Sequence, residues 1–288
     1  MLWCASIVPT IDAMTHVIDL NAYLRRIGHD GPLTPGLDTL RALTTAHVAA
    51  IPFENLDPLL RVPVSLEPEA IERKLVRDGR GGYCFEQNGL LLEVLRTLGF
   101  QVHGLIARVL WMKPEDAMVA QTHMLLRVEL EGESWLVDVG FGSMALSGAL
   151  RLQPDIEQAT GNEPFRLLEG GGDWRMQALV RGEWKTLYRF DLQPRPSIDY
   201  VVANHYTSTY PDSHFLHGLI AARTLAGRRL GLRNREFVVH PADGESVRRT
   251  LDGVEEIKQV LREQFDIRLP AHPELDRTLA ALPLPSQE

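Results

Sequence analysis

One stretch of the chain reads Arg80-Gly81-Gly82-Tyr83-Cys84-Phe85-Glu86-Gln87-Asn88, and it opens an apolar segment that continues to Leu98. The paired glycines allow the backbone to turn sharply before a helix begins. Cys84 then falls in the first helical turn, where unpaired N–H groups and the positive end of the helix dipole favour a thiolate over a thiol. Most lone cysteines are ordinary core residues. The interpretation of Cys84 therefore depends on partner side chains elsewhere in the chain.

Helices are predicted around this stretch, throughout the first hundred residues. Apolar residues recur at helical spacing, and the predicted segments are 17–27, 34–51, 68–78 and 84–98. Thr34 and Pro35 suit the start of the second segment, and Pro52 prevents its continuation. The fourth segment is apolar on nearly every side, so we expect it to be buried among the others.

The apolar pattern changes from helical to alternating after Gly99. The predicted strands are 101–110, 123–130 and 134–139, with further strands across 174–190. Turns are expected at Glu131-Gly132-Glu133 and Arg181-Gly182-Glu183, where glycine suits a tight hairpin. This middle region favours a barrel or a sandwich. Helical spacing returns beyond about Tyr206, most clearly at Val254, Ile257, Leu261 and Phe265.

The composition excludes several classes of protein. The chain has 288 residues, 44% of them hydrophobic, with 30 Lys and Arg against 38 Asp and Glu, a formal net charge of −8. This charge has the wrong sign for a protein that holds a phosphate backbone, so no nucleic-acid partner is expected. The two cysteines, Cys4 and Cys84, rule out a disulfide framework and a cysteine-rich metal site.

The sequence predicts a soluble, cytoplasmic protein. No apolar run approaches the roughly 18 residues of a membrane span. Residues 1–14 lack a basic leader and contain Pro9 and Asp12, which argues against a secretory signal. They suggest a loose extension, and Met14 is an alternative start of the chain.

His123 and Asp138 are the candidate partners of Cys84. Asp138 lies within the apolar run Trp135-Leu136-Val137-Asp138-Val139, where an unpaired carboxylate would be costly. A two-residue hairpin loop, either Glu131-Gly132 or Gly132-Glu133, places Asp138 on the same face as His123, and the first register makes them diagonal neighbours. A three-residue loop would place them on opposite faces. The chain thus contains a candidate nucleophile, base and orienting group in the order Cys, His, Asp.

These residues resemble those of the arylamine N-acetyltransferases. The resemblance rests on residues 80–88, on Thr122-His123, and on Leu136-Val137-Asp138-Val139-Gly140-Phe141-Gly142, with further similar segments at 52–56 and 204–209. It implies an α+β fold with a helical bundle over residues 1–99, a β-barrel over 100–205 and an α/β lid over 206–288. A cysteine-protease-like triad of Cys84, His123 and Asp138 would lie at the junction of the first two.

The resemblance also implies an activity. Acetyl-coenzyme A would acylate the cysteine, and an arylamine or arylhydrazine would then take the acetyl group in a ping-pong scheme without a metal or a bound cofactor. Glu54 and Arg80 would form a structural ion pair, Phe141 and Phe215 would line the acceptor pocket, and Gly140 and Gly142 would allow coenzyme A to approach. A monomer or homodimer is expected.

Without the resemblance, Phe141 and Phe215 would be interpreted as ordinary core residues, and Gly140 and Gly142 as part of a tight turn. Five arginines, Arg223, Arg228, Arg229, Arg233 and Arg235, favour a solvated basic face over phosphate contacts.

Three other interpretations fit parts of the pattern. A papain-like or transglutaminase-like cysteine hydrolase shares the order Cys, His, Asp. An amide synthase that closes a polyketide chain onto its own arylamine shares the whole architecture. A non-catalytic binding module would retain the cysteine segment only as packing.

Overall fold

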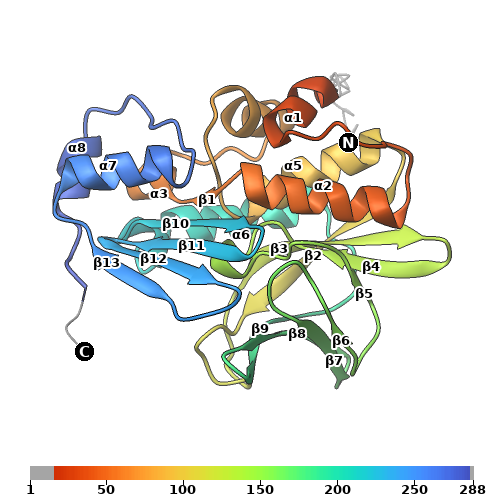
Figure 1. The fold of residues 1–288 in the computed structure, drawn as a ribbon. Helices are drawn as coiled ribbons and strands as arrows, with labels where there is room; N and C mark the ends of the chain where they lie inside the picture. Colours follow the sequence, from red (N-terminus) through yellow and green to blue (C-terminus); the bar gives the residue numbers. More distant parts are fainter. Residues whose placement is uncertain (1–15, 286–288) are drawn as a thin grey trace, which may run out of the picture.

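The computed structural model describes residues 16–285, and Figure 1 shows three groups of elements. Helices of the first hundred residues lie above a strongly curved sheet, and a second sheet with two helices lies beside both. The expectations for Met14 and Cys4 fall outside the described residues. Within residues 16–285, no helix is both long enough and apolar enough to cross a bilayer.

The first hundred residues form helices much as predicted. These helices are α1 (Leu20–Ile27), α2 (Leu37–Ala50), α3 (Leu56–Leu59), α4 (Pro68–Glu72) and α5 (Cys84–Thr97), with a π-helical turn η1 (Arg73–Arg77) after α4. Helix α1 begins later than predicted because Asp19 accepts a hydrogen bond from the Ala22 amide and ends the extended segment before it. The predicted cap at Thr34 is wrong, since Gly36 precedes the first turn of α2.

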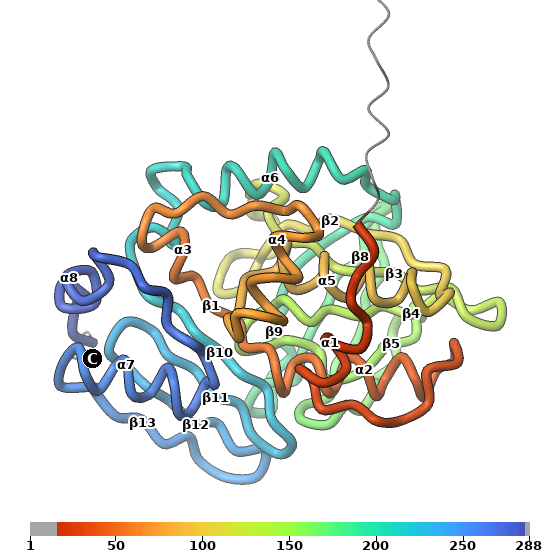
Figure 2. Tube along the Cα trace, turned by 90° about the horizontal axis from the view of Figure 1, so that it is seen from above, coloured from red at the N-terminus to blue at the C-terminus, as the bar shows by residue number. Residues whose placement is uncertain are grey.

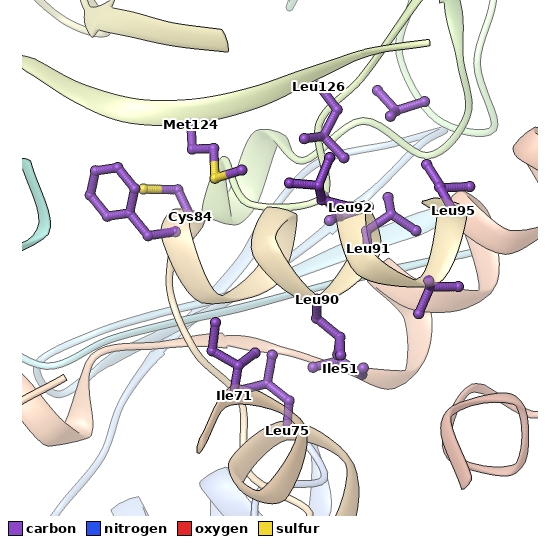
Figure 3. Close-up of a cluster of buried hydrophobic side chains, with 14 of the residues drawn as sticks. Ile51, Ile71, Leu75, Cys84, Leu90, Leu91, Leu92, Leu95, Met124 and Leu126 are labelled. Atoms are coloured by element: carbon purple, nitrogen blue, oxygen red, sulfur yellow. The ribbon is translucent and has the colours of Figure 1, made fainter. Parts of the chain in front are cut away.

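Helix α5 is the centre of the bundle (Figure 3). Its leucines Leu90, Leu91 and Leu95 are at most 2% exposed, which confirms the prediction of a buried helix. Strand residues Met124 and Leu126 pack on one side of α5, and side chains of α4 and η1 pack on another. Burial on several sides fixes the position of this helix and of the cysteine at its start.

An eight-stranded antiparallel sheet curls into a nearly closed barrel below the helices (Figure 1). The strand order is β5-β4-β3-β2-β9-β8-β7-β6. The bounds are β2 (Gln101–Val109), β3 (Gln121–Leu130), β4 (Glu133–Val137), β5 (Leu150–Arg151), β6 (Glu157–Gln158), β7 (Phe165–Gly170), β8 (Asp173–Val180) and β9 (Glu183–Phe190). Alternate residues of these strands fill the barrel with a separate hydrophobic core.

The hairpin between β3 and β4 adopts the first of the two registers considered above. Leu130 pairs with Glu133 and Leu126 pairs with Val137, which leaves the two-residue loop Glu131-Gly132. Both loop residues have positive φ, 52° and 80°, as a type I′ turn requires. Continuation of this register places Asp138 opposite Leu125 and diagonal to His123.

The C-terminal part contains a five-stranded sheet of order β1-β10-β11-β12-β13. The strands of this sheet are β1 (Phe53–Glu54), β10 (Ile220–Leu225), β11 (Arg228–Arg233), β12 (Glu236–Pro241) and β13 (Val247–Thr250). The helices of this part of the chain are α6 (Ser197–Thr209), the 3₁₀ turn η3 (His214–Leu216), α7 (Val254–Glu263) and α8 (Leu275–Ala280). The predicted return of helices beyond Tyr206 is confirmed by α7 and α8, but the four strands β10 to β13 come before them. Helix α6 begins before residue 205, and β1 joins this sheet from the N-terminal part (Figure 2).

Candidate active site

Cys84 is the first residue of α5, and its thiol is nearly buried, with the residue 5% exposed. The sulfur lies 3.6 Å from the carbonyl oxygen of Thr122 on β3. The glycines before it are sterically required: a β-carbon on Gly81 would lie 2.1 Å from the Pro52 carbonyl oxygen, and one on Gly82 would lie 2.6 Å from Glu86 Oε2. The turn predicted from Gly81-Gly82 therefore places the Cys84 thiol against the first residues of β3.

The structure brings His123 and Asp138 together beside Cys84. The Nε2 atom of His123 lies 2.7 Å from Oδ2 of Asp138, and the two residues are 3% and 2% exposed. The Cys84 sulfur lies against the carbonyl oxygen of Thr122, the residue directly before His123. A thiol, an imidazole and a carboxylate thus lie close together in space, as nucleophilic catalysis by a cysteine requires.

The charges of this group stabilise one another. Burial lowers the pKa of His123, but the Asp138 charge and hydrogen bonds to Asp138 and Cys84 outweigh burial and raise the pKa to about 10. Burial in turn raises the pKa of Asp138, while His123 and hydrogen bonds from Asn88 and the Gly140 amide hold it below its ordinary value. The geometry therefore favours a charged imidazolium and a charged carboxylate at neutral pH.

Sequence reasoning missed two residues that support this pair. Asn88 donates to Asp138 Oδ1 at 3.1 Å and to the Met124 carbonyl oxygen at 2.7 Å. Its spacing from Cys84, one helical turn, was a signal that both side chains face the same way. Tyr188 is 1% exposed on β9, and its ring lies 4.9 Å from that of His123. No local signal marks Tyr188, because only the folded barrel, in which β2 lies between β3 and β9, brings its ring to that of His123.

The two phenylalanines expected in the acceptor pocket pack against His123 and against Tyr83. The Phe141 ring meets the His123 ring edge to face at 5.0 Å between centroids. The Phe215 ring, from η3, lies 5.7 Å from that of Tyr83, the residue before Cys84. Both are partly buried, as expected for side chains that border a site.

The neighbouring glycines have different surroundings. A β-carbon on Gly140 would lie 2.6 Å from the Cys84 α-carbon, so the absent side chain makes room for the start of α5. Gly142 has a φ of +62°, which favours glycine, and it begins the 3₁₀ turn η2 (Gly142–Met144). Contact of either glycine with coenzyme A stays a prediction.

Arg80 and Glu54 form an ion pair behind the cysteine. The Nη2 atom of Arg80 lies 2.7 Å from Glu54 Oε1 and 2.8 Å from Asp57 Oδ1. Lys74 joins the same cluster by binding Asp57 Oδ2 at 2.7 Å and Glu86 Oε1 at 2.6 Å. The resemblance implied the first pair, but not the three residues that the folded chain adds, Asp57, Lys74 and Glu86.

The C-terminal arginines do not form one solvated face. Arg229 is 5% exposed, and its guanidinium lies 2.6 Å from Glu163 and 3.0 Å from the Ala145 carbonyl oxygen. Arg223 and Arg235 donate to backbone carbonyl oxygens. The expectation of a solvated face is wrong for Arg229, because the barrel supplies a carboxylate from a distant segment.

Comparison with known proteins identifies the family. The sequence profile of the N-acetyltransferase family matches residues 36–273. An arylamine N-acetyltransferase of Mycolicibacterium smegmatis is 46% identical over 256 residues, which are 88% of this chain and 93% of that protein. The chain belongs to the arylamine N-acetyltransferase family. A relative from Escherichia coli K12 is 44% identical over 86% of this chain and 88% of its own length.

Solved structures of the family have the same fold. The Mycobacterium marinum arylamine N-acetyltransferase in complex with CoA has a TM-score of 0.88 and 41% identity, and covers 92% of this chain and 99% of its own. The M. smegmatis structure has a TM-score of 0.89 and 44% identity, with 92% and 98% covered. These relatives are named for arylamine acetylation, so the comparisons do not favour a macrolactam-forming synthase or a cysteine hydrolase.

Proposed function

We propose that this chain transfers an acetyl group from acetyl-coenzyme A to an arylamine or arylhydrazine through a thioester on Cys84. The observation that carries the proposal is the buried contact of His123 with Asp138 at 2.7 Å, beside a thiol at the start of a helix. Family membership supports the reaction, and the geometry supports the assignment of Cys84, His123 and Asp138 as the catalytic triad.

In the first half-reaction the Cys84 sulfur attacks the thioester carbonyl carbon of acetyl-coenzyme A, and His123 holds the proton that the thiol releases. The tetrahedral intermediate collapses, the bond to the coenzyme A sulfur breaks, and His123 returns the proton to that sulfur as coenzyme A leaves. N–H groups at the start of α5 are the candidate donors to the oxyanion. Asp138 keeps the imidazole oriented and stabilises its charged form.

In the second half-reaction the acceptor nitrogen attacks the acetyl-Cys84 carbonyl carbon. His123 removes the proton from that nitrogen and returns it to the Cys84 sulfur as the carbon–sulfur bond breaks. Phe141 packs on His123 and Phe215 packs on Tyr83, the residue before Cys84, and such rings suit a flat aromatic acceptor. We assign these rings to the acceptor pocket, and Gly140 and Gly142 to the approach of the donor.

A single-turnover experiment tests the proposal. Acetyl-coenzyme A alone should add the mass of one acetyl group to the protein, and addition of an arylamine should remove it. Cys84→Ser should abolish uptake, because a hydroxyl is a far weaker nucleophile at neutral pH. Cys4→Ser is the matched control and should behave as wild type. Full turnover by the Cys84 variant would exclude the thioester mechanism, and no uptake by the wild type would favour a binding module.

We further propose that the protein acts in the cytoplasm as a monomer or homodimer. The absence of a membrane-spanning helix within residues 16–285 is consistent with this location. Sedimentation equilibrium would measure the mass of the assembly, and a larger oligomer would overturn the second part.

A further inference from the structure

Lys74 lies beneath the start of α5 and bridges two carboxylates. Its Nζ atom is 2.6 Å from Glu86 Oε1 and 2.7 Å from Asp57 Oδ2, and its side chain is 14% exposed. The residue belongs to the π-helical turn η1, which follows α4. The short distances and low exposure indicate a fixed ion pair, unlike most ion pairs on a protein surface.

Glu86, the partner of Lys74, holds the helix that carries the nucleophile. The side chain of Glu86 is 2% exposed, and its second oxygen, Oε2, accepts a hydrogen bond from the Tyr83 amide at 3.1 Å. Tyr83 is the residue immediately before α5, so this bond caps the helix at Cys84. Gly82 makes room for the carboxylate, since a β-carbon there would lie 2.6 Å from the same oxygen.

The cluster around Glu86 has more negative than positive members. Three carboxylates, Glu54, Asp57 and Glu86, face two cations, Lys74 and Arg80, a formal sum of −1. Arg80 is occupied by Glu54 and Asp57, and among the described residues Lys74 is the cation in contact with Glu86. A carboxylate that lacked this cation would disfavour a thiolate two residues away.

We propose that Lys74 is a positioning residue for acetyl transfer: it holds the Glu86 carboxylate on the Tyr83 amide and neutralises it beside Cys84. The inference rests on the proposed role of Cys84 as the nucleophile. It adds a residue, outside the triad, that sets both the place and the electrostatic environment of the thiol.

Two paired variants test the inference. In Lys74→Met the buried Glu86 carboxylate loses its cation, so alkylation of Cys84 by iodoacetamide at neutral pH should slow on the order of tenfold. Acetyl uptake from acetyl-coenzyme A should slow in parallel. The double variant Lys74→Met with Glu86→Gln removes the charge that needs neutralising and retains an oxygen for the Tyr83 amide. It should recover most of the lost rate although Lys74 is still absent.

The pH profile separates this role from simple packing. The groups that face Glu86 are Lys74, Asp57, Glu54 and Arg80, with Tyr83 and Cys84 on its own segment. Burial already raises the pKa of Glu86, and loss of Lys74 should raise it further. The rate deficit of Lys74→Met should therefore be full above that pKa and shrink as the pH falls and Glu86 takes up a proton.

The matched control is Lys185→Met, which removes an exposed ion pair with Glu183 on the barrel and should leave both rates unchanged. Equal rates in Lys74→Met and wild type, or a double variant as slow as Lys74→Met, would overturn the inference. If Lys74→Met does not fold, the single variant Glu86→Gln decides, because a tenfold loss there contradicts the proposed neutralisation. A wild type that alkylates at Cys84 but takes up no acetyl group would instead overturn the proposed function.

Discussion

At the scale of single residues, the buried carboxylate of Asp138 depends on several hydrogen-bond donors. Its carboxylate is buried and accepts hydrogen bonds from His123 at 2.7 Å, from the Gly140 amide at 3.0 Å and from Asn88 at 3.1 Å. Three donors from three segments converge on one side chain. Asp138 therefore has a part in both the chemistry and the stability of the protein.

We expect Asp138→Asn to reduce acetyl transfer by about 10³–10⁴-fold, because an amide can hold the imidazole in the wrong tautomer. The free energy of unfolding should fall by about 3–5 kcal/mol, as for other broken buried charge pairs. Steady-state kinetics and urea unfolding measure the two effects. The exposed Asp243→Asn is the control, and near-normal activity with unchanged stability in Asp138→Asn would remove Asp138 from the triad.

His123 should make stability depend on pH. Its pKa rises from the ordinary 6.5 to about 10 on folding, so its charged form stabilises the native state. That contribution is fully present below about pH 6.5 and is lost as the pH rises toward 10. Unfolding free energies of wild type and His123→Gln should therefore converge across this range. A constant difference would show that His123 is neutral in the fold, and the exposed His103→Gln serves as the control.

At the scale of elements, the start of α5 packs directly on the chain that leaves β4. The α-carbon of Cys84 and the Nδ2 atom of Asn88 occupy the space that a side chain on Gly140 would need. Asn88 Oδ1 also accepts a hydrogen bond from the Val139 amide at 3.1 Å. This contact sets the distance between the helix that carries the thiol and the strand that carries the carboxylate.

Gly140→Ala should therefore separate these two elements. Its β-carbon would lie 2.6 Å from a backbone atom, which cannot rotate away, so overpacking should cost about 1–3 kcal/mol of stability. Acetyl uptake should fall at least about tenfold, because small misplacements of reacting groups slow catalysis strongly. Gly231→Ala, where nothing lies within 4 Å of the new atom, is the matched control. Equal uptake in both variants would contradict this packing argument.

At the scale of the whole molecule, a short segment of the N-terminal part joins the C-terminal sheet. Strand β1 pairs with β10, and Asn55 follows directly with 0% exposure. The side-chain Nδ2 of Asn55 donates to the carbonyl oxygens of Phe215 and Gly218, and its Oδ1 accepts from the backbone amide of Ile220, at 2.7–2.9 Å. The C-terminal sheet is thus completed by residues of the N-terminal part.

Asn55→Ala should lower the stability of the entire protein by on the order of 3 kcal/mol, since buried backbone groups lose their partners. Four of the five tryptophans, at 111, 135, 174 and 184, lie between residues 100 and 205, so most of the tryptophan fluorescence reports the barrel, while circular dichroism reports all elements. We expect both signals to follow one urea transition in wild type and variant. Two separated transitions in the wild type would show that the C-terminal sheet unfolds on its own.

The sequence alone determined those features that depend on local physical chemistry. Helix α5 and its start at Cys84 follow from apolar spacing and from the two glycines that allow the chain to turn before it. The alternation of β3 and β4 placed His123 and Asp138 on one face, provided that the loop had two residues. These properties span at most about twenty residues, and backbone geometry relates such neighbours directly.

Only the tertiary structure decided which distant segments meet. Lys74 reaches Glu86, Tyr188 lies against His123, and Arg229 binds Glu163 across 66 positions. The resemblance implied an α/β lid here, but periodicity did not locate strands β10 to β13, whose sheet is completed by β1 from far earlier in the chain. Such contacts depend on how layers pack and on which buried charges must find partners, and no periodicity within one segment contains that information.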